Sequence, residues 1–415
     1  MQRVRMSLPY FKALGWDAEV VMVDPECSDM LKDELLLQSV PTDIKIHQVK
    51  ALNKKWTSKL GLGSLALRSL WYYKKKVNRI LSENTFNLIY FSTTQFPVCV
   101  LGWYWKKKWG VPYVIDMQDP WHSDYYRNKP KEQRPPKYWF SYRLNKYLEP
   151  IAMKNVDGLI AVSEHYINDL KERYPAIQNI PAATIPFGSS ETDMQIAESN
   201  KHLFPDLIQP GFINLVYVGR GGTDMHKAVT ALFKALQEGL QNDAQSLRKL
   251  KIYFIGTSYA PKGQAKPTIF PLAKQFDVQD KVVEIADRIS YYHTLITLKK
   301  ADALFIPGSD DPKYTASKIY PYLLTGKPLL TIFNSESPAM DVLNDYRVKF
   351  AYTYDSTNNI TLQVIDFFKN IINGFHTTQK YNEDTIKKYS AENMTRQQCL
   401  LFDQISDRVA FECQK

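Results

Sequence analysis

Three features are missing from this 415-residue chain, and each absence excludes a class of protein. No apolar run reaches the roughly 20 residues that a membrane-spanning helix needs. The amino terminus has no apolar core of the kind found in secretory signal peptides. The four cysteines, Cys27, Cys99, Cys399 and Cys413, are far apart and form no metal-ligand spacing. We therefore expect a cytosolic protein in a reducing compartment, with no bound metal.

Composition places the chain among ordinary globular proteins. Apolar residues make up 44% and charged residues 23% of the sequence, both within the usual range. A chain of 415 residues is long enough for two domains that each bury a sizeable core. We find no internal repeat and no low-complexity segment.

Acidic residues are absent between Lys45 and Arg79, although the chain carries a net charge of only +10. Trp56 and Trp71 lie among the basic residues of this stretch. The segment Trp103–Trp109 has the same mixture of tryptophan, tyrosine and lysine. The basic residues of the first stretch that follow its strand are Lys50, Lys54, Lys55, Lys59, Arg68, Lys74, Lys75, Lys76 and Arg79.

Mixed aromatic and basic residues suit an anionic membrane surface, where rings lie at headgroup level and each cation adds about 1 kcal/mol. We therefore predict that Lys50–Arg79 docks on an anionic membrane, which would make the protein peripheral on the inner face. A solvated helix face with its aromatic rings turned into the core explains the same pattern, and the sequence leaves both interpretations open. Nucleic acid is not expected as a partner, because no recognition motif accompanies the charge.

The amino-terminal segment departs from the usual order of an α/β domain. The chain begins with an amphipathic helix, Gln2–Leu14, followed by Gly15 and the strand Ala18–Val23. A Rossmann-like domain normally opens with a strand and a glycine-rich turn before its first helix. Either the first strand lies upstream of this sequence or another segment takes its place.

Strands and helices then alternate, which predicts parallel sheets with right-handed crossovers and an α/β fold. Tyr125–Lys137, rich in proline and basic residues, is predicted to be a mobile loop. The pattern becomes irregular between Ala182 and Gly211. The expected elements before that point are strands Ile44–Val49, Asn87–Phe91, Pro112–Met117 and Gly158–Val162, and helices Ser64–Leu81, Phe96–Trp109, Tyr138–Lys154 and Glu164–Tyr174.

The second half repeats the alternation and suggests three parts. We predict a first domain at residues 1–200, a second at 201–388 and a terminal helix at 389–415, with that helix at about Ser390–Phe411. A helix is expected from about His226. The strands expected in the second domain are Ile213–Val218, Lys251–Ile255, Val282–Ile285, Ala301–Ile306 and Pro328–Phe333.

The stretch Ala301–Phe333 has the order strand, loop, helix, turn, strand. Its loop, Gly308–Lys318, should lie at the carboxyl end of a strand and at the amino end of a helix running from about Ser317 to Thr325. Free backbone N–H groups and the helix dipole favour an anion there. Ser317 and Lys318 add a hydroxyl donor and a cation, so we predict that this loop binds a phosphorylated ligand.

A second phosphate-binding element is predicted at Gly219-Arg220-Gly221-Gly222, directly after a strand. Glycine lets the backbone approach a phosphate closely, because no Cβ intervenes. Arg220 offers a bidentate guanidinium, and Lys227 adds a point charge seven residues later. The alternative interpretation is an ordinary β–α turn with charges at the surface.

The segment Asp116–His122, with sequence DMQDPWH, follows a predicted strand of the first domain. Gln118 cannot act as an acid or a base, so any titratable role there passes to Asp119 or His122. A further segment, Ala161-Val162-Ser163-Glu164, is interpreted as the capped start of a helix.

Several of these segments resemble glycosyltransferase family 4. Ser317-Lys318, Tyr322-Leu323 and Gly326-Lys327-Pro328 are similar to the family's nucleotide-sugar segment, SK-xx-EYL-xx-GKP. The residues Arg220 and Lys227 resemble its G-R…K element. The segment at 116–122 resembles D-x-R-D-P-W, and residues 161–164 resemble AVSE. The resemblance runs over nearly the whole chain.

This resemblance implies the GT-B fold, in which two Rossmann-like domains face each other across a cleft and a carboxyl-terminal helix returns to the first. It implies transfer of a sugar from a nucleotide-sugar donor with retention, with no metal and no cofactor beyond that co-substrate. The acceptor is unidentified, with lipid-linked or polysaccharide acceptors as the classes in view. The implied catalytic residues are Arg220, Lys227, Asp119 and His122. The implied donor-binding residues are Gly219, Gly221, Gly222, Gly308, Asp310, Asp311, Lys313, Tyr314, Thr315, Ser317 and Lys318.

Two glutamates of the family pattern are replaced in this chain, by Lys313 and Pro321. In the family the first contacts the donor sugar and the second contacts the ribose. Asp310 and Asp311, just upstream, are the carboxylates that could take over. Two alternatives follow from the replacements: a catalytically silent GT-B binding or assembly subunit, and an epimerase acting on a nucleotide sugar.

Overall fold

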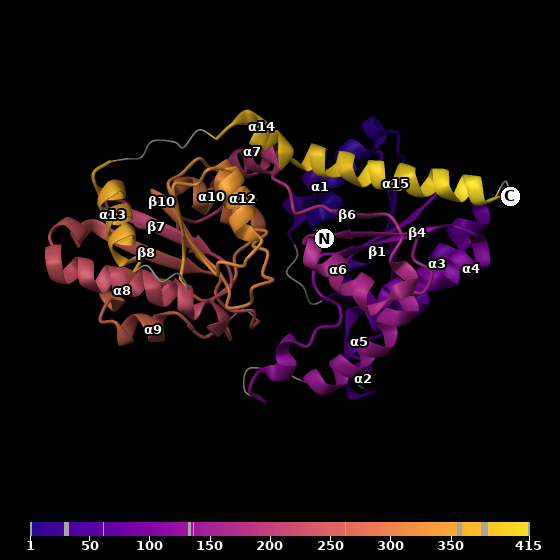
Figure 1. The fold of residues 1–415 in the computed structure, drawn as a ribbon, viewed down its shortest axis with the longest axis horizontal. Coiled ribbons are helices and arrows are strands. Elements are labelled where there is room, and N and C mark those ends of the chain that lie inside the picture. Colours follow the sequence, from indigo (N-terminus) through magenta and orange to yellow (C-terminus); the bar gives the residue numbers. More distant parts are fainter. Residues whose placement is uncertain are drawn as a thin grey trace. The chain divides into compact units, whose positions relative to one another are not determined.

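The computed structural model describes residues 2–28, 33–60, 62–131, 134–135, 137–261, 263–354, 359–374 and 381–413. The chain divides into two compact units (Figure 1). Unit 1 comprises residues 1–32, 39–187 and 391–415, and unit 2 comprises residues 33–38 and 188–390. Both units are built on parallel sheets, so the α/β prediction is confirmed.

Unit 1 contains two separate parallel sheets. The smaller pairs β1 (Glu19–Val23) with β2 (Lys45–Val49). The larger has the order β3-β4-β5-β6. Its strands are β3 (Ile89–Ser92), β4 (Tyr113–Met117), β5 (Gly158–Ala161) and β6 (Ala182–Thr184). Strand β6 lies in the stretch where the sequence pattern looked irregular. Its three residues, Ala-Ala-Thr, are too few to show the alternation of a strand.

Helices cover the sheets of unit 1 and largely match the predicted ranges. They are α1 (Gln2–Phe11), α2 (Lys54–Thr57), α3 (Leu65–Glu83), α4 (Val100–Trp109), α5 (Tyr138–Met153), α6 (Glu164–Arg173) and α15 (Ala391–Cys413). Helix α3 begins after Ser64, whose hydroxyl accepts a hydrogen bond from the backbone N–H of Leu67 at 3.2 Å. Helix α4 ends at Gly110, whose φ of 73° is favourable only for glycine. Part of the predicted loop 125–137 is a short 3₁₀ helix at Tyr125–Asn128.

The carboxyl-terminal helix α15 belongs to unit 1, as predicted, and packs against α1. The amide of Gln398 donates a hydrogen bond to the hydroxyl of Ser7 at 2.9 Å, and both side chains are buried. The ring of Phe402 lies 5.1 Å from that of Tyr90 and 6.3 Å from that of Phe11. The last helix is therefore part of the core of the first domain.

Unit 2 contains one six-stranded parallel sheet with the order β12-β11-β10-β7-β8-β9. Its strands are β7 (Ile213–Val218), β8 (Leu250–Ile255), β9 (Val282–Ile285), β10 (Ala303–Pro307), β11 (Leu329–Phe333) and β12 (Phe350–Thr353). Strand β12 was not predicted. The helices are α7 (Glu191–Ser199), α8 (His226–Asp243), α9 (Phe270–Gln275), α10 (Tyr291–Lys300), α11 (Ile319–Leu324), α12 (Ala339–Asp345), α13 (Thr361–Ile372) and α14 (Glu383–Lys388).

The strand order of unit 2 reverses between β7 and β10. From β7 the chain proceeds to β8 and β9 on one side, and then returns to β10, β11 and β12 on the other. In an open parallel sheet, ligands bind at the carboxyl ends of the two strands where the order reverses. The loops that follow β7 and β10 are the two loops for which the sequence predicted phosphate binding.

Helix α11 is shorter than predicted. It spans Ile319–Leu324, whereas the sequence suggested Ser317–Thr325. Pro321 lies in its first turn, where its missing N–H costs no hydrogen bond, and Gly326 ends it with a φ of 66°. A six-residue helix has a weak dipole, so its amino terminus contributes less to anion binding than the longer predicted helix implied.

Candidate functional site

Glycines bring the backbone close to its neighbours at the ends of β7 and β10. A Cβ on Gly219 would collide with the amine of Lys318, and one on Gly308 would lie 2.7 Å from the Cα of Phe333. The N–H of Gly221 donates to the carbonyl of Thr257 at 2.9 Å, which ties the β7 loop to the end of β8. At these two glycines the groups that approach the backbone closely are therefore other groups of the protein, the Lys318 amine and the Phe333 backbone.

The amine of Lys318 lies inside unit 2 at the β7–β10 reversal. Its Nζ donates to the hydroxyl of the fully buried Tyr217 at 2.7 Å, and Tyr217 donates to the carbonyl of Arg220 at 2.8 Å. Burial, together with the positive charges of Arg220 and Arg288, lowers the pKa of Lys318 to about 7. Among the described residues, no carboxylate lies within 4 Å of this amine. Such an amine is a strong candidate ligand for an anion.

The guanidinium of Arg220 is held by Asp224, four residues later. Its two terminal nitrogens donate to the two carboxylate oxygens at 2.7 and 2.6 Å. Burial alone would raise the pKa of Asp224, but the hydrogen bonds and charge of Arg220 outweigh it, and the pKa is lowered. Ser309 donates to the same carboxylate at 2.7 Å, and the N–H of Asp310 donates to the Asp224 carbonyl at 2.7 Å. Asp224 thus joins the loop after β7 to the loop after β10.

The loop after β10 carries the remaining predicted donor-binding residues. The ring of Tyr314 lies 5.6 Å from the guanidinium carbon of Arg220. Asp311 accepts a hydrogen bond from the N–H of Lys313 at 2.9 Å, which shapes the turn. Lys313 and Ser317 are exposed. Thr315 accepts at its carbonyl from the N–H of Ser317 at 3.1 Å.

Lys227 lies in the first turn of α8 and is exposed. Its Nζ is 5.8 Å from the centre of the Tyr354 ring, whose hydroxyl donates to the carbonyl of Ser309 at 2.9 Å. The structure therefore brings Arg220, Lys227 and Lys318 to one edge of the unit 2 sheet.

Sequence reasoning missed the residues that hold these cations. They are Tyr217, Asp224 and Ser309. It also missed Arg288, whose positive charge lowers the pKa of Lys318 and whose guanidinium lies 4.7 Å from the centre of the Tyr259 ring. Asp224 could have been found, because an acid four residues after an arginine is a common pairing distance. Nothing in the sequence links Tyr217 to Lys318, which are 101 residues apart.

In unit 1, Asp116 is a buried hub at the carboxyl end of β4. Its Oδ2 accepts hydrogen bonds from Ser92 at 2.9 Å, Gln118 at 2.8 Å and Tyr90 at 3.2 Å. The Nε of Arg3 lies 2.8 Å from the same oxygen, and its terminal nitrogens donate to two carbonyls that follow β6. Gln118 therefore serves the packing of this hub, in agreement with the expectation that it has no titratable role.

Asp119 is exposed and His122 is half-buried. The backbone N–H of His122 donates to the buried Glu149 at 2.9 Å, and its ring lies 4.8 Å from that of Tyr142. Burial lowers the pKa of His122. A neutral imidazole at pH 7 could accept a proton.

The predicted cap at Ser163 is wrong in one respect. Helix α6 begins at Glu164 as expected, but the hydroxyl of Ser163 makes no capping hydrogen bond and has no partner among the described residues. The segment 161–164 is thus a strand-to-helix junction without the side-chain cap.

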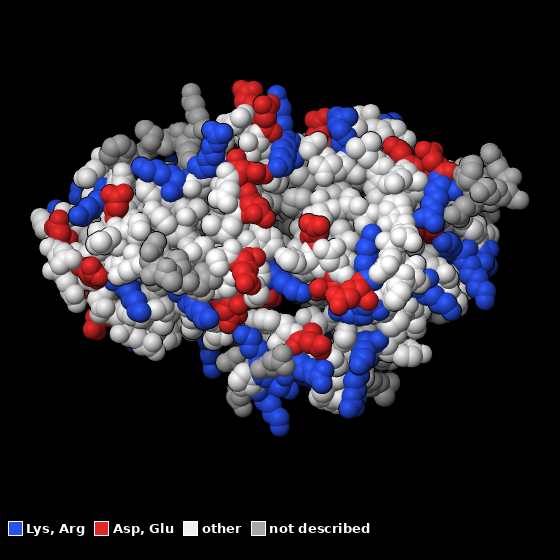
Figure 2. Space-filling model, viewed as in Figure 1, with Lys and Arg blue, Asp and Glu red and all other residues white. Residues whose placement is uncertain are grey.

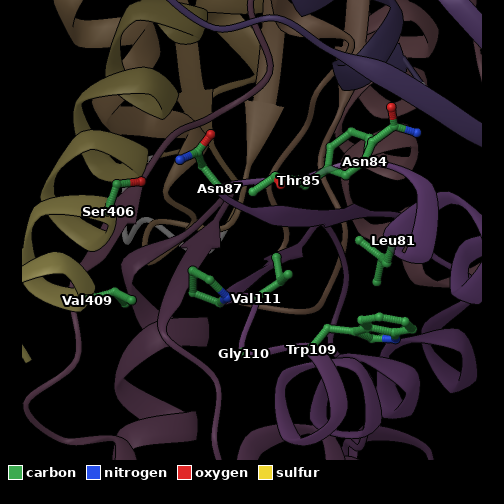
Figure 3. A pocket seen from close by; sticks show the side chains of 11 residues that line it. Leu81, Asn84, Thr85, Asn87, Trp109, Gly110, Val111, Ser406 and Val409 are labelled. Atoms are coloured by element: carbon green, nitrogen blue, oxygen red, sulfur yellow. The ribbon is translucent and has the colours of Figure 1, made fainter. Parts of the chain in front are cut away.

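A pocket of about 370 Å³ opens in unit 1, at the amino ends of β3 and β4 (Figure 3). The amino ends of strands are the edge opposite the one where the predicted residues of unit 1 lie. Its lining residues are Leu81, Asn84, Thr85, Phe86, Asn87, Trp109, Gly110, Val111, Pro112, Ser406 and Val409. None of the predicted site residues lines it, so it plays no part in the candidate site.

Comparison with known proteins supports the predicted family. Residues 10–188 match the model of Glycosyltransferase Family 4. No curated protein sequence matches the chain.

In the described part of the chain no helix is long and apolar enough to cross a bilayer. The same residues contain no group of three or more histidine, cysteine, aspartate or glutamate side chains that could hold a metal ion.

Solved structures share the fold at low sequence identity. Anabaena HepE in complex with UDP is 16% identical, with 99% of this chain and 94% of that chain covered and a TM-score of 0.51. WaaG, a glycosyltransferase involved in lipopolysaccharide biosynthesis, is 13% identical, with coverage of 98% and 95% and a TM-score of 0.51. The amino-terminal domain of Candida albicans trehalose-6-phosphate phosphatase is 12% identical, with coverage of 97% and 92% and a TM-score of 0.61.

At these identities the structural likeness establishes the fold alone. The chain has the GT-B fold, and its residues 10–188 match the model of glycosyltransferase family 4.

Proposed function

We propose that this protein transfers a sugar from a nucleotide-sugar donor, with the donor diphosphate bound by unit 2 between the loops after β7 and β10. The observation that carries the proposal is the amine of Lys318, buried at the β7–β10 reversal with a hydroxyl partner and no described carboxylate partner. A bound diphosphate would give this amine a negatively charged partner.

The departing diphosphate needs positive charge more than the bound donor does, because negative charge develops on it as the glycosidic bond breaks. Arg220, Lys227 and Lys318 are the residues that we assign to this task, and Asp224 would hold Arg220 in place. This chemistry requires no metal ion. We further propose that the anomeric configuration is retained, as the family resemblance implies.

The acceptor is proposed to be lipid-linked or a growing polysaccharide. Its side of the reaction would fall to unit 1, where Asp119 and His122 are the titratable candidates. The exposure of Asp119 and the partial exposure of His122 agree with a role in contacting a bound molecule.

The second candidate function is a silent binding subunit. One observation favours it: both terminal nitrogens of Arg220 are engaged by Asp224, so a diphosphate would have to share the guanidinium with that carboxylate. The replacement of the family's glutamates by Lys313 and Pro321 points the same way. An epimerase would use the same donor site without an acceptor.

Three assays on the purified protein separate these functions. Release of nucleotide diphosphate from labelled nucleotide sugars separates an enzyme from a silent binder. Product that forms only with an added lipid or polysaccharide acceptor separates a transferase from an epimerase, which instead interconverts the donor sugars. Lys318→Ala is the variant expected to lose activity, and Lys234→Ala, an exposed lysine on α8, is its matched control. Turnover that survives in Lys318→Ala would overturn the proposed site.

Membrane docking by Lys50–Arg79 remains a proposal, and its residues divide between the two interpretations. Trp56 and Trp71 are 73% and 60% exposed, as docking requires. Arg68 is buried and donates to the carbonyl of Leu52 at 2.7 Å, as a structural residue would. If the stretch docks, the protein would be peripheral on the cytosolic face of the membrane.

A further inference from the structure

The backbone of Trp121 and His122, shortly after β4 in unit 1, is held by side chains of two helices. Glu149 of α5 accepts a hydrogen bond from the N–H of His122 at 2.9 Å, and Arg173 of α6 donates one to the carbonyl of His122 at 3.2 Å. Asn145, one turn before Glu149, accepts a hydrogen bond from the indole N–H of Trp121 at 3.2 Å and donates one to its carbonyl at 3.1 Å. Helices α5 and α6 therefore fix this segment at two successive residues.

The carboxylate of Glu149 is fully buried, and both of its oxygens have donors. Its Oε2 accepts the hydrogen bond from the N–H of His122. Its Oε1 accepts hydrogen bonds from Arg173 and from the hydroxyl of Tyr174, the latter at 2.8 Å. Burial and the charge of Glu149 raise the pKa of Tyr174, so this hydroxyl stays protonated and remains a donor. The carboxylate therefore has a fixed position from which it holds the segment after β4.

Stability alone does not explain why α5 carries a buried acid. Taking a carboxylate out of water costs free energy that its attraction to a cation seldom exceeds, and apolar side chains of similar volume often stabilise a core as well or better. The solvent side of the helix would offer Glu149 cations at no such cost, since Arg143 and Lys146 are exposed there. Lysine and arginine side chains gather at the lower end of Figure 2, where Figure 1 carries the label α5. The geometry that Glu149 gives to the segment after β4 is the better explanation.

The exposed carboxylate of Asp119 lies on this segment, between two fixed points. On its amino side the amide of Gln118 donates a hydrogen bond to the buried Asp116 at 2.8 Å. On its carboxyl side the chain is held at Trp121, whose side chain is itself buried. Asp119 and Pro120 are the two residues between these points, and the ring of Pro120 restricts its own φ. The backbone that carries Asp119 therefore has little freedom to move.

We propose that Asn145, Glu149 and Arg173 are positioning residues for the acceptor side of the transfer reaction. They give Asp119 and His122 a fixed place on unit 1 from which to contact the acceptor. Because Glu149 is fully buried, it acts through the backbone of His122 and does not touch the acceptor. The inference rests on the proposed function, since without an acceptor there is nothing to position. A displacement near 1 Å of a group that contacts the substrate can cost a factor of about 10² in rate.

Variants of the full chain test the positioning: Asn145→Ala, Glu149→Gln and Arg173→Met, with Arg173→Lys as the conservative replacement. Asn145→Ala leaves no charge unpaired, so it tests the inference even if the buried Glu149→Gln does not fold. The matched control is Asp157→Asn. The carboxylate of Asp157 accepts a hydrogen bond from the backbone N–H of Tyr113 at 2.9 Å and also pairs with a lysine. It thus holds one backbone N–H and one cation, as Glu149 does, but at the amino end of β4, the opposite edge of the sheet.

Transfer is measured with UDP-, GDP- and ADP-glucose as donors and with octyl glucoside or maltotriose as acceptor. Asn145→Ala, Glu149→Gln and Arg173→Met should each lower kcat/KM for the acceptor about 10- to 100-fold. Arg173→Lys should recover part of that loss. The affinity for nucleoside diphosphate, measured by calorimetry, should not change, because unit 2 binds it. Asp157→Asn should unfold at a lower temperature than the wild type and transfer at the wild-type rate.

The inference is overturned if the wild type transfers sugar and the variants at Asn145, Glu149 and Arg173 do so equally well. It is also overturned if Asp157→Asn loses as much transfer as these variants do, because the effect is then one of stability. Loss of nucleoside diphosphate affinity in proportion to the loss of transfer overturns it as well, because the effect is then not confined to the acceptor side. A wild type that forms no product with any of these pairs counts against the proposed function, and this inference falls with it.

Discussion

Lys318 and Tyr217 are joined by a 2.7 Å hydrogen bond between the lysine Nζ and the buried phenol. The bond connects the segment after β10 to the strand β7, across the point where the strand order of unit 2 reverses. It holds an amine in a buried position that already faces two arginines, Arg220 and Arg288, and one acid, Asp224. The free protein therefore keeps this amine partly uncharged near pH 7, and a bound anion would restore its charge.

The affinity for a nucleoside diphosphate should fall as pH rises above about 7. Burial and the two arginines lower the pKa of Lys318 to about 7 in the free protein, whereas a bound diphosphate raises it. Binding above pH 7 therefore takes up a proton, and the dissociation constant should increase by up to tenfold per pH unit. Calorimetry between pH 7.5 and 9 avoids the phosphate ionisation near pH 6.

Lys318→Met is the control for this pH dependence. It should bind weakly at every pH, with a flat profile. The stability of the free wild-type protein should depend on pH in the opposite direction. Because the unfolded lysine holds its proton up to its ordinary pKa of 10.5, stability should rise between pH 7 and 10.5. An affinity that does not change from pH 7.5 to 9 would contradict this account of the amine.

Asp224→Asn should lower kcat more than it weakens diphosphate binding. The amide keeps one hydrogen bond to Arg220 but loses the paired charges that fix the guanidinium. A misplaced guanidinium should lower the rate about 10- to 100-fold, because a displacement near 1 Å can cost a factor of about 10². Asp243→Asn, an exposed acid on α8, is the control. If kcat is unchanged while KM rises, Asp224 does not position Arg220.

Arg3→Ala should destabilise unit 1 by about 3–5 kcal/mol, because it leaves the carboxylate of Asp116 buried without its cation. The loss is measured from the denaturant midpoint of the unit 1 transition. Arg79→Ala removes an exposed pair with Glu83 and should cost far less stability, because solvent screens that pair. Similar losses of stability in the two variants would show that the buried Arg3–Asp116 pair stabilises the protein no more than the exposed pair does.

Lys313→Glu should change the preference among donor sugars more than it changes stability. Lys313 is exposed, and a surface substitution usually shifts stability by less than about 0.5 kcal/mol. A cation near the donor sugar would favour an acidic sugar, and a glutamate would disfavour it. Competition between uronic and neutral nucleotide sugars measures the change. An unchanged ranking, together with lost binding in Asp311→Ala, would assign donor choice to the aspartate.

Sequence reasoning located most strands of both units and most helices of unit 1, because their apolar runs and glycine turns are local signals. It gave no ranges for α7, α9, α10, α12, α13 and α14. It predicted a site at Gly219–Gly222, which follow β7 directly, and at Lys318, which immediately precedes α11. It could not find the Tyr217–Lys318 and Asp116–Arg3 contacts, which form between segments 101 and 113 residues apart. It also missed β12 and β6, the latter of which has only three residues. Contacts between residues so far apart in the sequence form only when the chain folds.

The central claim is that unit 2 binds the donor diphosphate between the loops after β7 and β10. Calorimetry tests it most directly, with UDP, GDP and ADP titrated into the wild type, Arg220→Ala, Lys318→Ala and the control Lys234→Ala. The account predicts that one nucleotide binds the wild type and the control equally, and that each site variant loses about 1.5–3 kcal/mol of binding free energy. Unchanged affinity in both site variants would contradict it.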